Sequence, residues 1–242
     1  AEAIVSTAFV NRVKEMICSS VDQIYDSTVQ NKFLDRYRGW IASSKQNNFV
    51  GLDMFKTAAF SNGTTESFDK FYLSNCTRRF RCFRGEYMYH QASWRNYFSW
   101  CFLDNEPLSN NDAVVISMPF SDFGFEHPQT QNILNQAHAL KVPVLIDCAF
   151  FGICAGINFD FSHPAISTVT FSLSKSFPVA NLRIGMRLTR FDDDDSLLVM
   201  NKTNYTNRMG AAVGLQILDE FGPDDSYMRW RSSQEKLDRK ST

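Results

Sequence analysis

The chain has 242 residues, of which 44% are hydrophobic and 21% are charged, and its formal net charge is −1. This composition is typical of a globular protein, and the length corresponds to one large domain or one and a half. A net charge near zero argues against nucleic acid and anionic membranes as partners. The longest apolar run, residues 142–157, is shorter than the ~20 residues of a membrane helix. The six cysteines form no CxxC pair and have no histidine at zinc-ligand spacing, which predicts reduced thiols in a cytoplasmic protein and no zinc site. The N-terminus has no basic region followed by an apolar one, so no signal peptide is expected.

The first half of the chain reads mainly as helix. Apolar residues recur at three- and four-residue steps up to about residue 44, as expected for an amphipathic helix. Residues 54–60 fit either a strand or a helix end, and the turn Asn62-Gly63-Thr64-Thr65 interrupts them. A helix with Phe68, Phe71 and Tyr72 on one face is expected next. Residues 80–89 predict a strand that leads into an aromatic loop, and residues 94–102 predict a further helix.

The second half alternates strands with helices. Continuous apolar runs predict strands over residues 113–118, 142–146, 168–172 and 184–188, and a helix with Pro128 in its first turn is expected over 128–140. Such strands indicate a sheet that is buried on both faces and largely parallel. The predicted fold class is therefore α/β, with three α/β/α layers around a mostly parallel central sheet. The acidic run over 191–195 fits a solvated turn, with a cation site as the alternative.

Three polar residues lie at the ends of predicted strands. Asp147 directly follows a buried strand, where it is either a helix cap or a ligand-binding group. Lys175 follows the next strand and is flanked by the hydroxyls of Ser174 and Ser176. Desolvation there would favour the free amine that forms a Schiff base, whereas a lone lysine is more often a strand-end residue whose amine reaches solvent. Arg183 opens the fourth strand, and alone it is best explained as a structural ion-pair residue.

Together, Asp147-Cys-Ala-Phe150, Ser172-Leu-Ser-Lys175 and Arg183-Ile-Gly185 resemble the core signature of fold type I pyridoxal phosphate (PLP) dependent aminotransferases of class I/II. The resemblance implies that Lys175 is the catalytic residue, bound to PLP as a Schiff base. It also implies that Asp147 bonds the pyridine nitrogen and that Ser172 and Arg183 hold the phosphate, with Ser174 beside them.

Upstream segments extend the resemblance over about residues 50–215. The turn at Gly63, Thr64 and Thr65 is similar to the family's phosphate-binding turn, and a helix N-terminus does offer free N–H groups to an anion. The segment around Tyr87 falls where the family places an aromatic ring on the cofactor, and we prefer Tyr87 to Tyr89 for this role. Residues 117–124 resemble the family's turn before a helix, with Ser121 in a cofactor-binding position.

Two substitutions depart from the family pattern. Ser121 stands where the family has an asparagine, and Phe150 stands where it has a tyrosine, and both family residues bond the ring oxygen of the cofactor. The residues after Lys175 also show no counterpart of the small C-terminal domain that grips the substrate carboxylate. We therefore expect either a naturally short protein or a fragment, and we expect cofactor binding to be better preserved than catalysis.

The resulting expectation has three segments and two functional alternatives. Residues 1–48 form an N-terminal helical segment, 49–215 the PLP-binding large domain, and 216–242 a C-terminal helix and tail. The resemblance implies a homodimeric aminotransferase that acts on a small amine or amino acid. The alternatives are a non-catalytic protein of the same fold with a binding or regulatory role, and another PLP reaction such as a lyase.

Overall fold

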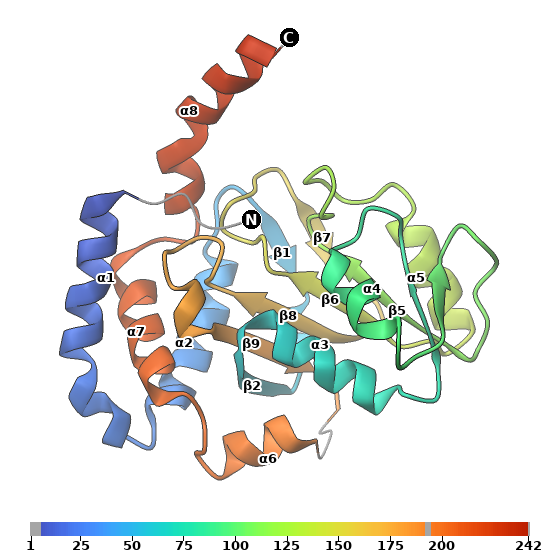
Figure 1. Cartoon of the computed structure of the whole chain (residues 1–242), viewed down its shortest axis with the longest axis horizontal. Coiled ribbons are helices and arrows are strands. Elements are labelled where there is room, and N and C mark those ends of the chain that lie inside the picture. Colours follow the sequence, from blue (N-terminus) through green and yellow to red (C-terminus); the bar gives the residue numbers. More distant parts are fainter. Residues whose placement is uncertain (1–5, 192–194, 242) are drawn as a thin grey trace.

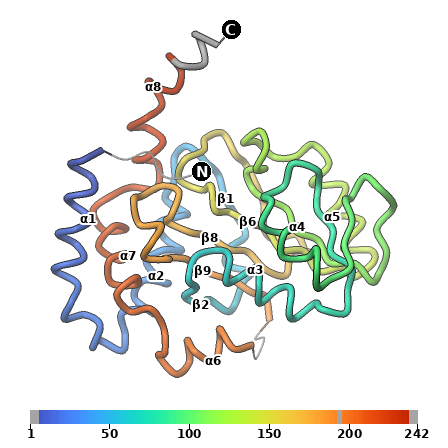
Figure 2. The backbone as a smooth tube through the Cα atoms, viewed as in Figure 1, coloured from blue at the N-terminus to red at the C-terminus, as the bar shows by residue number. Residues whose placement is uncertain are grey.

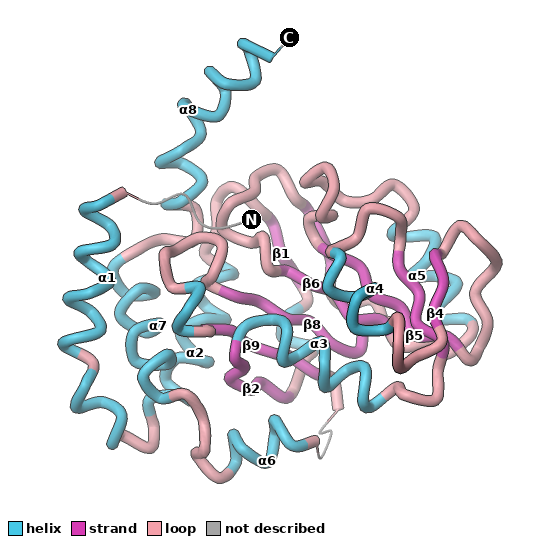
Figure 3. Tube along the Cα trace, viewed as in Figure 1, coloured by secondary structure: helices cyan, strands magenta, loops and turns pink. Residues whose placement is uncertain are grey.

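The computed structural model describes residues 6–191 and 195–241. Its centre is a seven-stranded sheet with helices on both faces (Figures 1 and 3). Strand β9 runs antiparallel to both of its neighbours, and the strands from β8 to β4 are all parallel. This confirms the predicted α/β class with a mostly parallel central sheet. In spatial order the strands are β2 (Thr57–Asn62), β9 (Ile184–Thr189), β8 (Ile166–Ser172), β6 (Val144–Cys148), β5 (Asp112–Ser117), β3 (Arg79–Cys82) and β4 (Trp100–Phe102).

The alternation of side chains along the buried strands creates two hydrophobic layers. In β5, Val114 and Ile116 belong to one core cluster, and Ala113 and Val115 belong to another on the opposite face. Successive strand residues point to opposite faces, so a strand that is apolar at every position needs a helical layer on each side.

The first layer is built by segments that lie far apart in the sequence. Helices α1 (Thr7–Ser19) and α2 (Val29–Ala42) lie beside α7 (Arg208–Glu220), as the blue and orange tubes of Figure 2 show. Helix α5 (Thr130–Ala139) contributes Ile133 and Leu134 to the same core cluster. The predicted boundary between residues 215 and 216 falls within α7, and the three-segment division stays a prediction.

The second layer consists of α3 (Gly63–Ser74) and α4 (Met88–Trp94), and it is rich in aromatic rings. The remaining elements lie outside these layers: η1 (Val21–Tyr25), η2 (Leu52–Met54), η3 (Ala180–Leu182), α6 (Ser196–Lys202), α8 (Asp225–Ser241), and a small parallel sheet of β1 (Asn48–Val50) and β7 (Asn158–Asp160). Helix α8 projects from the body of the domain (Figure 1).

Most predicted elements are present, with one clear error. The predicted helix over 94–102 is wrong, because α4 ends at Trp94 and residues 100–102 form strand β4. Phe98, Trp100 and Phe102 pack against the aromatic cluster from a turn and an edge strand, so apolar residues at near-helical spacing gave a misleading periodicity. The helix expected from Pro128 begins at Thr130, and the ambiguous run at 54–60 contains the end of η2 and the start of β2.

A buried ion pair links the neighbouring strands β3 and β5. Arg81 and Asp112 are both fully buried, and Nη1 of Arg81 lies 2.6 Å from Oδ2 of Asp112. Arg79 also binds Asp112, at 2.8 Å. A buried carboxylate held by two guanidinium groups is stable only as long as its partners remain.

The predictions made from composition concern the cysteines, membrane-spanning helices and the acidic run over 191–195. All six cysteines are free thiols. In the part of the chain that the structure describes, no helix has the length and apolarity needed to cross a membrane. Of the acidic run, Asp192–Asp194 lie outside the described residues, whereas Asp195 caps α6 and pairs with Arg187.

Candidate active site

The predicted site residues gather at one edge of the sheet. Strands β3, β5, β6 and β8 are parallel neighbours, so their carboxyl ends meet there, as in other open α/β sheets that bind ligands at this edge. Asp147 lies near the end of β6, Ser117 ends β5 and Ser172 ends β8. Strand β9 runs the opposite way, and therefore Arg183, just before its start, reaches the same edge.

Arg183 and the turn at the start of α3 form an anion cradle. Nη2 of Arg183 donates to the carbonyl of Asn62 at 3.1 Å and to Oγ1 of Thr65 at 2.9 Å. Gly63 has a φ of +74°, and a Cβ at this position would lie 2.3 Å from Nη2 of Arg183. The site therefore needs glycine both for its backbone conformation and for the space that the guanidinium occupies. Thr64 is buried beside them.

Ser172 and Ser174 join the cradle from strand β8. Oγ of Ser172 donates to Oγ of Ser174 at 2.9 Å, and the backbone N–H of Ser174 donates to Oγ of Ser172 at 3.1 Å. Ser172 also pairs in register with Gly185, where a Cβ would lie 2.9 Å from the backbone of Gly63. Two hydroxyls, a guanidinium and a helix N-terminus thus converge, which is a donor set that suits a phosphate group.

Asp147 and Lys175 occupy the next positions along the edge. Asp147 is 5% exposed, and its Oδ1 accepts the backbone N–H of Ala149 at 2.9 Å. Burial, and to a smaller extent the charge of Glu86, raises the pKa of the Asp147 carboxyl to about 7, against the lowering effects of the Ala149 N–H and the Lys175 ammonium. Nζ of Lys175 lies 6.0 Å from the centre of the Phe150 ring, so the lysine and the substituted family position face each other.

Glu86 is a site residue that sequence reasoning missed. It is 5% exposed, and its carboxylate accepts the N–H of Ser117 at 2.7 Å, the hydroxyl of Ser117, and the N–H of Tyr87 at 3.2 Å. Burial raises the pKa of the Glu86 carboxyl to about 7. The sequence offered one usable signal, since Glu86 is a charged residue within the Gly85 to Tyr89 segment that carried the family resemblance.

Ser121 is tied to this carboxylate through Ser117. The two hydroxyl oxygens lie 3.0 Å apart, and Ser117 also bonds Glu86. Ser121, the residue expected to bond the ring oxygen of the cofactor, is therefore linked to Glu86 through Ser117. All three residues lie at or beyond the carboxyl ends of β3 and β5.

The aromatic residues proposed for ring stacking lie at the N-terminus of α4. The rings of Tyr87 and Tyr89 stack on each other with centroids 6.0 Å apart. The hydroxyl of Tyr89 donates to Asp69, whereas Tyr87 follows Glu86 directly and is 41% exposed. His90, which was not predicted, is fully buried, bonds Tyr72 through Nδ1, and lies against the Tyr87 ring.

Comparison with known proteins identifies the family. Residues 88–241 match the family model described as aminotransferase class I and II. The chain therefore belongs to this family, which confirms the resemblance to fold type I PLP-dependent aminotransferases. No curated protein matches the chain in sequence.

Solved structures show the same fold at low sequence identity. Alanine aminotransferase from Pyrococcus furiosus aligns with a TM-score of 0.66 and 13% identity, over 93% of this chain and 65% of that one. L-threonine-O-3-phosphate decarboxylase from Porphyromonas gingivalis aligns with a TM-score of 0.66 and 12% identity, over 92% and 73%. The PLP-bound C-S lyase from Staphylococcus hominis aligns with a TM-score of 0.64 and 12% identity, over 89% and 61%. These proteins carry different reactions on one fold, so the likeness defines architecture and leaves the reaction to the site.

Proposed function

We propose that the chain is a PLP-binding protein of the aminotransferase type, with Lys175 as the covalent attachment residue and an amino acid or related amine as substrate. The observation that carries this proposal is the convergence of Arg183, Gly63, Thr65 and Ser172 on one anion cradle, on the same sheet edge as Asp147 and Lys175. These groups fit both ends of the cofactor, since the donors of the cradle suit a phosphate and the buried carboxylate of Asp147 suits a protonated ring nitrogen.

The roles of the residues follow from their surroundings. Arg183, Thr65, Ser172 and the N-terminus of α3 would bind the phosphate, with Gly63, Thr64 and Ser174 shaping the cradle. Asp147 would hold a proton at the pyridine nitrogen, because a buried carboxylate gains most from a positively charged partner. Tyr87 would cover one face of the ring.

When bound, PLP supplies the electron sink that stabilises negative charge at the substrate Cα. The protein contributes orientation and proton transfer. The amine of Lys175 would serve as the base that takes the proton from the substrate Cα. Glu86 orients Ser117, and through it Ser121, whose hydroxyl would bond the ring oxygen of the cofactor.

The proposal is tested by a half-reaction. PLP-loaded protein is mixed with single amino donors, and the visible absorbance of lysine-bound PLP is followed. Transfer of the amino group converts the donor to its keto acid and releases the cofactor from Lys175 as pyridoxamine phosphate. Loss of the absorbance together with keto-acid formation supports the proposal. A donor set that leaves bound PLP unchanged would refute amino-group transfer.

A non-catalytic role is the second candidate, and one contact favours it. Lys175 faces the ring of Phe150, which stands where the family has a tyrosine. The ring oxygen of a bound cofactor would therefore lack the hydroxyl donor that the tyrosine provides. In this case PLP would bind and no donor would react. A lyase reaction, as in the Staphylococcus protein, would instead release a fragment of the substrate without forming pyridoxamine phosphate.

We also propose a homodimer and a cytoplasmic location. Family resemblance supports the dimer, and the six free thiols are in line with a reducing compartment. Light scattering on purified protein would measure the mass of the assembly directly, and a monomer at micromolar concentration would contradict the dimer.

A further inference from the structure

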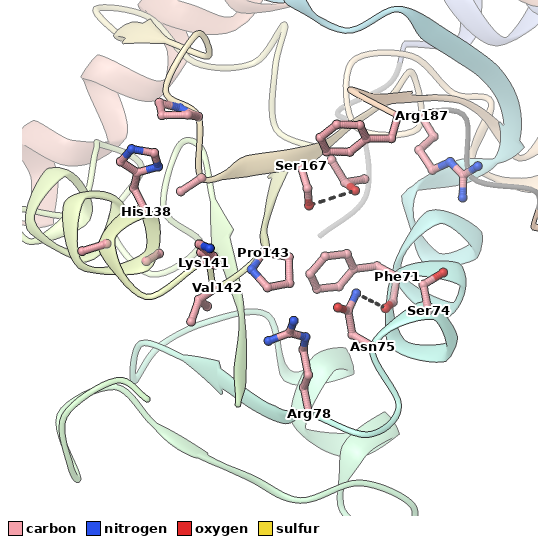
Figure 4. A pocket seen from close by; sticks show the side chains of 16 residues that line it. Phe71, Ser74, Asn75, Arg78, His138, Lys141, Val142, Pro143, Ser167 and Arg187 are labelled. Atoms are coloured by element: carbon pink, nitrogen blue, oxygen red, sulfur yellow. Dashed lines mark hydrogen bonds between the residues drawn. The ribbon is translucent and has the colours of Figure 1, made fainter. Parts of the chain in front are cut away.

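A cavity lies at the edge of the sheet opposite to the one that carries Lys175. Its volume is about 720 Å³, which falls in the range of roughly 300–1,000 Å³ typical of small-molecule sites. Residues of the loop before β6 and of the start of β8 line it, together with the last turns of α3 and α5 and the end of β9 (Figure 4). Lys175 follows the other end of β8, a strand of seven residues, so the two sites are separated by roughly 20 Å of sheet.

The lining of this cavity is basic. Arg78, Lys141 and Arg187 contribute to it, and among the residues that the structure describes, those that line it include no aspartate or glutamate. Within the described parts of the chain, the hydrogen bonds of the Arg78 side chain are made through Nη1, to the carbonyls of Asn110 and Asp112. These bonds position the guanidinium, which extends toward the centre of the pocket (Figure 4), and leave donors for a ligand.

Arg187 adds a buried donor at the wall. It is 3% exposed and pairs with Asp195, which offsets its charge. Its Nε–H is buried without a hydrogen-bond partner among the residues described by the structure. Unsatisfied buried donors are rare in folded proteins. Lys141 supplies an exposed ammonium from a residue with a φ of 55°.

Apolar and ring surfaces complete the pocket. Phe71 and Phe191 line it together with Pro143 and Pro164, and the Phe191 side chain is 70% exposed. Ser74, Ser167 and Thr168 also line the cavity and add hydroxyl groups to it. A ligand that satisfies this lining has an anionic end for the guanidinium and ammonium groups and a flat apolar part for the rings.

We propose that this cavity is a binding site for a small anion that carries a planar ring, the chemistry of a nucleoside monophosphate. The site is separate from the cofactor cradle at Arg183 and does not depend on PLP. Its ligand would act on the protein from the far side of the sheet.

The test uses adenosine monophosphate as the probe in calorimetric titrations of the purified chain. Adenosine and inorganic phosphate are the controls that each lack one half of the probe. Lys141→Asn removes the ammonium and is well tolerated, because asparagine accepts a positive φ more readily than most residues. Arg78→Gln removes the guanidinium. Lys56→Asn, at an exposed lysine outside the cavity, and Arg183→Gln, in the cofactor cradle, are the matched controls.

The proposal expects adenosine monophosphate to bind more tightly than adenosine or phosphate. Each pocket variant should weaken binding about tenfold, as expected for the loss of a hydrogen bond to a charged group, and both control variants should bind as the wild-type chain does. No binding at millimolar concentration, equal binding of adenosine, unchanged affinity in Lys141→Asn, or loss of binding in Arg183→Gln would each overturn the proposal.

Discussion

Replacing Gly63 with alanine tests the anion cradle most finely. Gly63 has a φ of +74°, and its new Cβ would lie 2.3 Å from Nη2 of Arg183. The left-handed conformation alone costs a non-glycine residue about 1–2 kcal/mol. In addition, the guanidinium must move away, which breaks its hydrogen bonds to Asn62 and Thr65. Losing a charged hydrogen bond to the phosphate costs about 1.5–3 kcal/mol, so the Kd for PLP should rise roughly tenfold to a hundredfold.

Gly156 provides the matched control. It has a φ of +79°, and a Cβ there would meet nothing within 4 Å. Gly156→Ala should therefore lose about 1–2 kcal/mol of unfolding free energy in urea, and Gly63→Ala should lose more because hydrogen bonds of Arg183 also break, but only Gly63→Ala should lose PLP affinity in a spectroscopic titration. Wild-type PLP affinity in Gly63→Ala would refute the assignment of the cradle.

Three further outcomes are expected. The folded-state pKa of Asp147 is raised to about 7, so the unfolded state releases this proton first and stability of the PLP-free protein falls between about pH 4 and 7. Asp147→Asn should therefore exceed the wild-type stability at pH 8 by about 4 kcal/mol, at 1.36 kcal/mol for each pKa unit, and equal urea curves at pH 5 and 8 for both proteins would contradict this. Glu86→Gln removes the negative charge near Asp147, so the Asp147 titration midpoint should move to lower pH when followed by NMR; an unmoved midpoint argues against their coupling. Asp112→Ala leaves Arg81 buried without its main partner and should cost about 3–5 kcal/mol, whereas Asp104→Ala, which breaks an exposed pair, should cost less than about 1 kcal/mol in the same denaturation assay.

The parts of the fold that the sequence predicted are those with uniform burial. Strands β5, β6, β8 and β9 are buried at nearly every position because both faces of the sheet are covered, and the apolar and β-branched residues in them can be recognised from the sequence. Strand β4 was misread because it is a short edge strand whose aromatic residues pack only partly, so its apolar spacing matched a helix as well as a strand. The reversed direction of β9 also leaves no trace in its composition.

The site divides in the same way. Asp147, Ser172, Lys175 and Arg183 could be proposed from the sequence because each stands near one end of a predicted strand and the four follow the order of the family signature. Glu86 was missed because its burial depends on β3 and β5 lying side by side, which only the assembled sheet reveals. The basic cavity at the other edge was missed for the same reason, since its residues come from α3, α5, β8, β9 and the loops between elements.

The most direct test of the account is the chemical identity of the PLP attachment point. Protein incubated with PLP is reduced with borohydride, digested, and mapped by mass spectrometry. The account predicts a single reduced adduct on Lys175, and its loss in Lys175→Ala while Lys56→Ala retains it. An adduct spread over surface lysines, or no stable adduct at all, would contradict the assignment of Lys175 as the cofactor-binding residue.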